Sequence, residues 1–459
     1  MENMAERFAA EVLEAKVAAA LREAGASEAS LQAATRAMMH ASLLGVDSHG
    51  VRLTEHYCTM LAAGRLNRDP QLKVDIRAAG SAMVDGDDGL GHYAAYKAVD
   101  HVVIKGPIPS DRKRVLVLGC STGYGLASRI VTTFGSGADT VGVSFEREPG
   151  EAKPASAGWY NNRAFENRAR AAGAKAVTIE GDAFSDAVKA ETIKAIKANL
   201  GQVDLIVYSL ASPVRTDPKD GVTYRSVIKP YGAPVTSKTL NTATGEVSEI
   251  SVEPATEEEA AATVKVMGGE DWELWIAALA EAGVLADGFT TLNYTYLGSE
   301  LTWPIYHKGT LGKAKADLDR AAAAIRAAHG AEAAHVVALK AVVTQASSAI
   351  PVVPLYGTLL IKVEDELGLG EGPIQQIDRL FREKLTNLKL DDEKRIRVDD
   401  WELSEAMQAE LKKRWAALTT ETLPALADLP KYREEFLKLF GFAVGGVDYS
   451  QDVDPRVVN

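Results

Sequence analysis

Residues 114–130 read RVLVLGCSTGYGLASRI, and this stretch decides the fold. A short apolar run leads directly into three glycines and then into the spacing of an amphipathic helix. Gly119, Gly123 and Gly125 follow a Gly-x3-Gly-x-Gly spacing, which is related to the GxGxxG turn of dinucleotide-binding sheets. Such a turn lets backbone N–H groups approach a pyrophosphate at the positive end of the helix. The stretch therefore predicts a strand, a phosphate-binding turn and a helix.

The alternation of strand and helix patterns continues along the chain. Val- and Ile-rich runs such as DTVGVSF and VDLIVYSLA are separated by helical patterns such as NRAFENRARAA and DAVKAETIKAIKANL. This order predicts an α/β fold with a doubly wound, mostly parallel, Rossmann-like sheet and helices on both faces. Residues 212–255 are polar and contain the hairpin-like pieces DPKDGVTY and TATGEVSEISVEP, so we expect a small antiparallel excursion that covers the substrate.

The first hundred residues differ from the rest of the chain. They are rich in Ala, Glu and Leu with helical spacing, as in FAAEVLEAKVAAAL, and predict a helical module. The stretch KGPIPSDRKR then breaks the pattern with Gly, Pro and charges. We therefore expect an N-terminal domain over 1–104 and a Rossmann-like domain over 105–459.

Composition excludes several function classes. The net charge of -12 and the pI near 5.3 oppose binding to nucleic acid or to an anionic membrane. No apolar run reaches the roughly 18 residues of a membrane span. Only two cysteines occur, too few for a disulfide framework, so we expect a cytoplasmic protein. The eight histidines are scattered, and we expect no metal site.

The strand that follows the glycine turn predicts the choice of dinucleotide. Glu146 ends this strand, 21 positions after Gly125, where a carboxylate can accept hydrogen bonds from the adenosine ribose. The same carboxylate would repel a 2′-phosphate, which favours NADH over NADPH. Four further residues end the next two strands at the same edge of the sheet: Asp182, Ala183, Leu210 and Ala211.

The turn also fits a different chemistry. Residues 119–123 satisfy GxSxG, the elbow that exposes a serine nucleophile in α/β-hydrolases, with Ser121 as the nucleophile. His307, His329 or His335 would then serve as the base. The hydrolase interpretation leaves Gly125 and Glu146 without a role, but it stays open at this point.

Tyr306 and Lys315 form the candidate catalytic pair. Their nine-position separation corresponds to about two and a half turns of one helix, which would place them on opposite faces. They can meet if Tyr306 lies on a loop and a helix begins near Thr310. The phenol would donate to an oxygen that gains negative charge, and the nearby ammonium would stabilise the phenolate and hold the dinucleotide. Alternatively, Tyr306 is a core aromatic and Lys315 lies on a solvated helix face.

From about Lys113 onward the sequence closely resembles the NADH-dependent trans-2-enoyl-CoA and enoyl-acyl-carrier-protein reductases. The matching stretches include VLVLGCSTGYGLASR, DLIVYSLASPVRTDP, VKVMGGEDWELWI, ELTWPIY, VVTQASSAIPV and IRVDDWEL. The resemblance implies reduction of a trans-2-enoyl thioester of coenzyme A or acyl carrier protein by NADH, in a monomer. It implies that Tyr306 donates the proton, that Lys315 assists it, and that Tyr296 contacts the substrate.

The resemblance also implies a set of residues that contact NAD. These are Gly119, Cys120, Ser121, Thr122, Gly123, Tyr124, Phe145, Glu146, Asp182, Ala183, Leu210, Ala211, Lys315, Val343, Thr344 and Gln345. A nucleotide-binding protein made inert by an altered N-terminus remains an alternative function.

The N-terminal module resembles another family. LLGVDSHGVRLTEHY and VDGDDGLGHYAAYKAVD are similar to the beginning of the malate/L-lactate type of 2-oxo-acid dehydrogenases, whose DSHG histidine would be His49. The arginine that follows, Arg52, stands three positions after His49 instead of four, and the rest of that family's chain is absent. We therefore expect a fused fragment without dehydrogenase activity of its own, in which His49 is a helix-end or buried polar residue.

Overall fold

The computed structural model describes residues 9–78, 81–96, 107–151, 153–210, 212–348, 350–445, 447–451 and 453–456. It separates into two compact units, Met1–Gly106 and Pro107–Asn459. Each unit has its own hydrophobic core.

The N-terminal unit contains both helices and a hairpin. Its helices are α1 (Ala10–Glu23), α2 (Glu28–Leu43) and α3 (Thr54–Ala62), with two short 3-10 turns, η1 (Asp47–His49) and η2 (Val51–Leu53). Val17, Leu21, Leu31, Met38 and Leu61 are buried between these helices. Strands β1 (Lys73–Ala78) and β2 (Ser81–Asp85) pair in antiparallel fashion. The purely helical prediction was therefore incomplete, because the alternation in KVDIRA is a short strand signal beside strong helix patterns.

His49 ends the first 3-10 turn of this unit. It is exposed, and its Nδ1 lies 2.9 Å from Ser48 Oγ. Of the two structural roles expected for His49, the structure has the helix-end role and not the buried one.

A seven-stranded sheet forms the centre of the second unit. Its strands are β3 (Arg114–Leu118), β4 (Asp139–Ser144), β5 (Ala176–Glu180), β6 (Val203–Tyr208), β11 (Leu285–Thr295), β12 (Ala334–Ala338) and β13 (Ile396–Arg397). Their spatial order is β13-β12-β11-β6-β3-β4-β5, and all neighbouring pairs are parallel. The order reverses between β3 and β6, so the carboxyl ends of these two strands form the switch point at which such sheets bind ligands.

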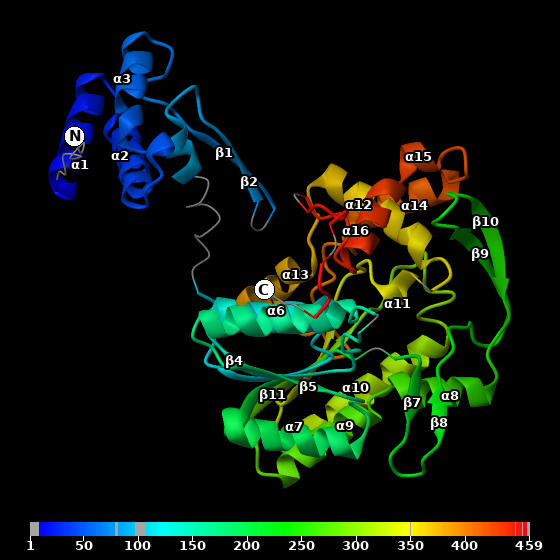
Figure 1. Ribbon diagram of the computed structural model, residues 1–459. Coiled ribbons are helices and arrows are strands. Elements are labelled where there is room, and N and C mark those ends of the chain that lie inside the picture. Colours follow the sequence, from blue (N-terminus) through cyan, green and yellow to red (C-terminus); the bar gives the residue numbers. More distant parts are fainter. Residues whose placement is uncertain are drawn as a thin grey trace. The chain divides into compact units, whose positions relative to one another are not determined.

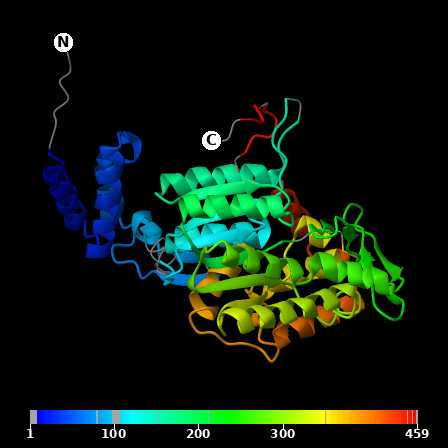
Figure 2. The same ribbon diagram turned by 90° about the horizontal axis from the view of Figure 1, so that it is seen from below.

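Helices cover both faces of this sheet, as the alternation predicted. Figure 1 shows α6 on one face and α7, α9 and α10 on the other, and in Figure 2 the long helices lie side by side with roughly aligned axes. Along β3, Leu116 and Leu118 face the core under α7, α9 and α10, whereas Val115 and Val117 face the core under α5 and α13. The helices are α5 (Gly123–Ile130), continued by η3 (Val131–Gly135), α6 (Ala157–Ala171), α7 (Asp186–Asn199), α8 (Glu257–Met267), α9 (Glu270–Glu281), α10 (Thr310–His329) and α13 (Pro373–Arg379), continued by η4 (Leu380–Lys384).

The excursion consists of two antiparallel hairpins, as expected. One pairs β7 (Val214–Thr216) with β8 (Thr223–Arg225), and the other pairs β9 (Val235–Leu240) with β10 (Val247–Val252). The segment between the hairpins bonds to the start of α10, where Thr310 N donates to Lys229 O at 3.0 Å. The excursion therefore helps to fix the loop that carries Tyr306.

A helical subdomain completes the second unit. It contains α11 (Gln345–Ser348), α12 (Val353–Leu367), α14 (Glu405–Ala417), α15 (Leu423–Leu426) and α16 (Leu429–Lys438). Leu355, Leu359, Met407 and Leu411 are buried in its core. Among the helices that the structure describes, none has the length and hydropathy needed to cross a bilayer.

Candidate active site

The glycine turn lies at the switch point of the sheet. Gly119 adopts a φ of +82°, and a Cβ there would come within 2.1 Å of Ser209 O at the end of β6. A Cβ on Gly125 would come within 1.9 Å of Gly119 O, so this glycine lets α5 approach the strand closely. Gly123, with a φ of +52°, begins α5, and a Cβ on it would meet no atom within 4 Å. The turn thus leaves open space at the amino end of a helix, where an anion binds favourably.

Glu146 lies just beyond β4 and beside this turn. Its Oε1 accepts a 2.6 Å hydrogen bond from Ser121 Oγ, and Asn161 Nδ2 donates to Ser121 O at 3.0 Å. Gly158, near the start of α6, packs against the same carboxylate. Phe145 is 81% exposed. The adenosine end of the expected cofactor site therefore has a carboxylate that a serine hydroxyl holds in one orientation.

The hydrogen bond from Ser121 to Glu146 argues against the hydrolase alternative. The serine hydroxyl donates to a carboxylate, whereas the candidate bases contact other groups: His307 lies beside Trp303, His329 beside Phe289, and His335 beside Glu332. No imidazole contacts the Ser121 hydroxyl within the part of the chain that the structure describes. The elbow therefore lacks the base that a serine nucleophile needs.

The remaining cofactor candidates follow neighbouring strands. Asp182 and Ala183 lie two and three positions after the end of β5, and Leu210 lies two positions after the end of β6, all at the carboxyl edge. Ala211 lies outside the described residues. Val343, Thr344 and Gln345 lie beyond the carboxyl end of β12, on the loop that leads into α11.

Tyr306 and Lys315 lie where the loop-then-helix prediction places them. Tyr306 precedes α10, and its N–H donates to Thr302 O at 3.0 Å. Lys315 is on the second turn of α10, next to the buried Ala314. Lys315 Nζ lies 5.8 Å from the centre of the Tyr306 ring. The chain therefore brings the phenol and the ammonium together despite their separation in sequence.

Burial dominates the electrostatics of this pair. Desolvation raises the pKa of the Tyr306 phenol, so the direction is opposite to the one expected from the Lys315 charge alone. Desolvation, assisted by the charge of Arg395, lowers the pKa of the Lys315 ammonium to about 8. At neutral pH the phenol therefore keeps its proton, and most of the lysine remains cationic.

A cavity of about 490 Å³ connects the predicted residues. Six of them line it: Tyr124, Leu210, Tyr296, Tyr306, Lys315 and Thr344. The excursion contributes Ser212, Pro213, Ser226 and Ile228 to the same wall. The glycines of the turn, Glu146 and Asp182 do not line this cavity, so the candidate site extends from the cavity along the edge of the sheet to β4.

Two polar atoms in the cavity wall are available to a ligand. Asn293 Nδ2 and Thr295 Oγ1 are buried without a hydrogen-bond partner among the described residues. Such groups are costly unless a ligand or water satisfies them. An amide donor and a hydroxyl on β11, in the wall of this cavity, suit the carboxamide of a nicotinamide ring, so the residues present fit an NAD-type cofactor.

Sequence reasoning missed Asn293 and Thr295, and it also missed a carboxylate beside the cavity, Glu402. The hydroxyl of Tyr296 donates to Glu402 Oε1 at 3.2 Å, and the Tyr296 ring packs edge-on against Tyr306, with ring centres 5.2 Å apart. Glu402 is only 1% exposed and comes from the turn after β13. The stretch IRVDDWEL contains it, but an acidic residue in a charged turn carries no distinguishing signal in sequence.

Three family models describe the second unit and a fourth describes the first. The trans-2-enoyl-CoA reductase catalytic region matches residues 153–386, its NAD(P)H binding domain matches 93–151, and the enoyl reductase FAD binding domain matches 390–453. The malate/L-lactate dehydrogenase model matches residues 8–106.

Curated relatives and solved structures agree with these matches. The enoyl-[acyl-carrier-protein] reductase [NADH] of Edwardsiella ictaluri is 52% identical over 79% of this chain and 92% of its own length. The FabV enzyme of the same description from Aeromonas salmonicida is 54% identical over 77% of this chain and 90% of its own. The trans-2-enoyl-CoA reductase of Treponema denticola in complex with NAD has a TM-score of 0.73 at 50% identity, covering 76% of this chain and 88% of that one.

Proposed function

This chain belongs to the trans-2-enoyl-CoA reductase family, and on that basis we propose that it reduces the carbon–carbon double bond of a trans-2-enoyl thioester with NADH. The products are the saturated acyl thioester and NAD⁺. The observation that carries this proposal is the cavity at the carboxyl edge of the sheet, whose wall contains both Tyr306 and Lys315. The thioester is carried by coenzyme A or by acyl carrier protein, the two carriers that appear in the names of the relatives.

Tyr306 is the proton donor of the proposed reaction. NADH supplies the hydride that reduces the β-carbon, which leaves negative charge on the thioester oxygen. The Tyr306 hydroxyl gives its proton to that enolate oxygen, and the resulting enol tautomerises so that the α-carbon carries the proton in the saturated product. Solvent then returns a proton to the Tyr306 phenolate. A buried phenol with a raised pKa is suited to this task because it keeps its proton until charge develops beside it.

Lys315 and the glycine turn hold the cofactor. The Lys315 ammonium supplies positive charge beside the Tyr306 ring and can donate to a ribose hydroxyl. The N–H groups at the start of α5 bind the pyrophosphate, and Glu146 accepts hydrogen bonds from the adenosine ribose.

The test of this function is an assay with crotonyl-CoA and NADH, in which the nicotinamide absorbance falls as NADH is consumed. Tyr306→Phe should lower turnover roughly a hundredfold to a thousandfold while NADH still binds. Tyr294→Phe is a matched control, since Tyr294 lines the same cavity but its hydroxyl is paired with Ser128 Oγ at 2.8 Å. Near-normal turnover of the Tyr306 variant would show that another group donates the proton. No turnover by the unmodified protein would favour the inert nucleotide-binding alternative.

We further infer that residues 1–104 are a fused module without dehydrogenase activity. The match to the malate/L-lactate dehydrogenase model ends at residue 106, close to the division between the two compact units. His49 is exposed and paired with its neighbour Ser48. The full chain, incubated with NAD and malate or lactate, should form no NADH, and any steady NADH formation would contradict the inference.

A further inference from the structure

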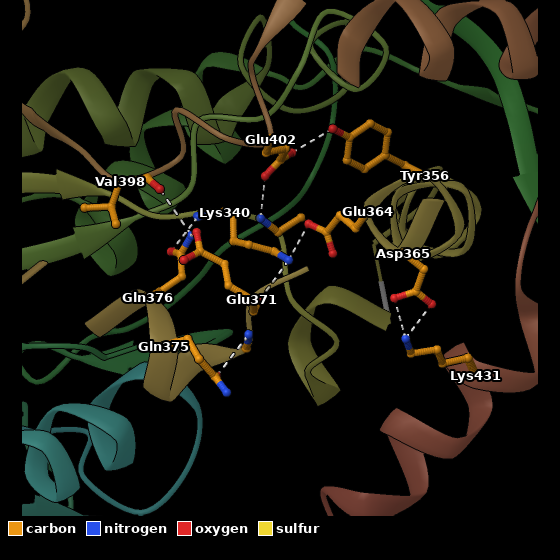
Figure 3. A network of polar contacts seen from close by, with 12 residues as sticks. Lys340, Tyr356, Glu364, Asp365, Glu371, Gln375, Gln376, Val398, Glu402 and Lys431 are labelled. Atoms are coloured by element: carbon orange, nitrogen blue, oxygen red, sulfur yellow. Dashed lines mark hydrogen bonds and ion pairs between the residues drawn. The ribbon is translucent and has the colours of Figure 1, made fainter. Parts of the chain in front are cut away.

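A buried carboxylate lies behind the substrate cavity. Glu402 follows β13, and Ala341 follows the neighbouring strand β12. Because the two strands are parallel, their carboxyl ends lie side by side, and this brings Glu402 close to Ala341. Glu402 Oε2 accepts a 2.7 Å hydrogen bond from Ala341 N. Its Oε1 accepts from the Tyr356 hydroxyl at 2.7 Å and from the Tyr296 hydroxyl at 3.2 Å. Figure 3 shows Glu402 facing Tyr356, in the same network as Lys340 and Glu364.

These contacts reach two different parts of the molecule. Tyr296 and Ala341 both line the cavity that contains Tyr306. Tyr356 is fully buried in α12, away from the cavity wall. The carboxylate thus joins the cavity to the helical subdomain through hydrogen bonds that all point toward it.

Ionisation decides whether Glu402 can keep all three donors. An ionised carboxylate is only an acceptor and can satisfy three donors, whereas the protonated acid is itself a donor. A protonated carboxyl accepts weaker hydrogen bonds than a carboxylate, and its own O–H would face three groups that now donate to it. The Tyr296 hydroxyl and the Ala341 N–H, which line the cavity, would therefore be held less firmly once Glu402 is protonated.

We propose that Glu402 is a positioning residue for the reduction: its ionised carboxylate holds the Tyr296 hydroxyl and the Ala341 backbone at the cavity wall, and its protonation weakens that hold. Glu402 does not itself touch the reacting atoms and acts through Tyr296. This inference rests on the proposed function, since Tyr296 contacts the acyl group only if the cavity binds the enoyl thioester.

The groups around Glu402 shift the pKa of its carboxyl toward neutral pH. Burial raises the pKa of the Glu402 carboxyl to about 7, against the hydrogen bonds from Tyr356 and Ala341 that lower it. The Lys340 ammonium also lowers this pKa, whereas the Glu364 carboxylate raises it. Lys340 and Glu364 form a buried ion pair, so their effects on Glu402 partly cancel. From α14, Gln408 is uncharged and donates to Glu402 O at 2.7 Å.

The pH dependence of kcat/KM for the enoyl thioester tests this role. In the unmodified protein kcat/KM should fall as the pH drops through about 7, because protonation removes the active form. Glu402→Gln should abolish that fall and lower kcat/KM at the optimum roughly tenfold, with the KM for NADH unchanged. If the fall persists in this variant, another group titrates and the proposal is wrong.

A second pair of variants tests the proposal without removing the carboxylate. Tyr356→Phe deletes a hydrogen bond that favours the ionised form, so the fall should move to higher pH. Tyr432→Phe is the matched control, because the Tyr432 hydroxyl pairs with Ser348 Oγ at 2.9 Å and does not contact Glu402. If kcat/KM falls at the same pH in Tyr356→Phe as in the unmodified protein, the proposal is wrong. It is also wrong if the pH of the fall shifts equally in Tyr432→Phe.

These outcomes are separate from a failure of the proposed function. If the unmodified protein does not turn over crotonyl-CoA with NADH, the function itself is wrong. If it turns over the substrate but its variants show the unmodified pH profile, only the role of Glu402 is wrong. If Glu402→Gln fails to fold, the direction of the shift in Tyr356→Phe decides.

Discussion

Replacing Gly158 with alanine should weaken NADH binding without touching the catalytic pair. A Cβ at this position would lie 2.1 Å from Glu146 Oε1 and 2.8 Å from Ser121 Cβ. The Glu146 carboxylate must therefore retreat by roughly 1 Å to reach a normal contact distance. That movement breaks the 2.6 Å hydrogen bond from Ser121 and carries the carboxylate away from its expected ribose position.

The size of the effect follows from the contact that is lost. A hydrogen bond to a charged group contributes about 1.5–3 kcal/mol, so the Kd for NADH should rise by roughly tenfold or more. The turnover at saturating NADH should stay within about twofold, because Tyr306 and Lys315 lie on other elements. The preference for NADH over NADPH should also narrow, since the displaced Glu146 repels a 2′-phosphate less.

Titration of the protein with NADH, followed by nicotinamide fluorescence, measures this effect. Gly150→Ala is the control, because a Cβ on Gly150 meets no atom within 4 Å and its φ lies outside the left-handed region. An unchanged Kd in Gly158→Ala would refute the reasoning, since Glu146 would then not bind the ribose. A lower kcat at saturating NADH would also refute it, because the change would have reached the catalytic pair.

Two other perturbations address the catalytic lysine and a buried ion pair. Because burial lowers the pKa of Lys315 to about 8, its ammonium is lost as the pH rises through that value. The kcat/KM for NADH should fall there, and Lys315→Arg should move the fall to higher pH; an identical fall in both proteins would contradict this role. In the structure Arg379 Nη2 lies 2.5 Å from Glu371 Oε1. Arg379→Met therefore leaves the Glu371 carboxylate buried without its guanidinium partner. Urea denaturation should show a loss of about 3–5 kcal/mol, which Glu371→Gln in the same chain should partly restore; a loss below about 1 kcal/mol would contradict the pairing argument.

Local sequence patterns predicted the architecture well. The Val-rich runs before and after the glycine turn became β3 and β4, and the hairpin-like pieces of the excursion became β7–β8 and β9–β10. These signals are short-range, because strand alternation and glycine turns depend on a few consecutive residues. The helix beginning at Thr310 was predictable for the same reason, and it explained how Tyr306 and Lys315 meet. The β1–β2 hairpin was missed because its pattern spans only a few residues beside strong helix signals.

What the sequence by itself determined is the order of strands and helices, the glycine turn, and the identity of the phenol and the ammonium. What only the tertiary structure decided is which distant groups surround them. Glu402 stands 106 positions after Tyr296, yet parallel pairing of β12 and β13 brings it behind the cavity wall, within hydrogen-bond distance of Tyr296. Burial then reversed the expected shift of the Tyr306 pKa, because desolvation depends on every element packed around a side chain and no local pattern records it.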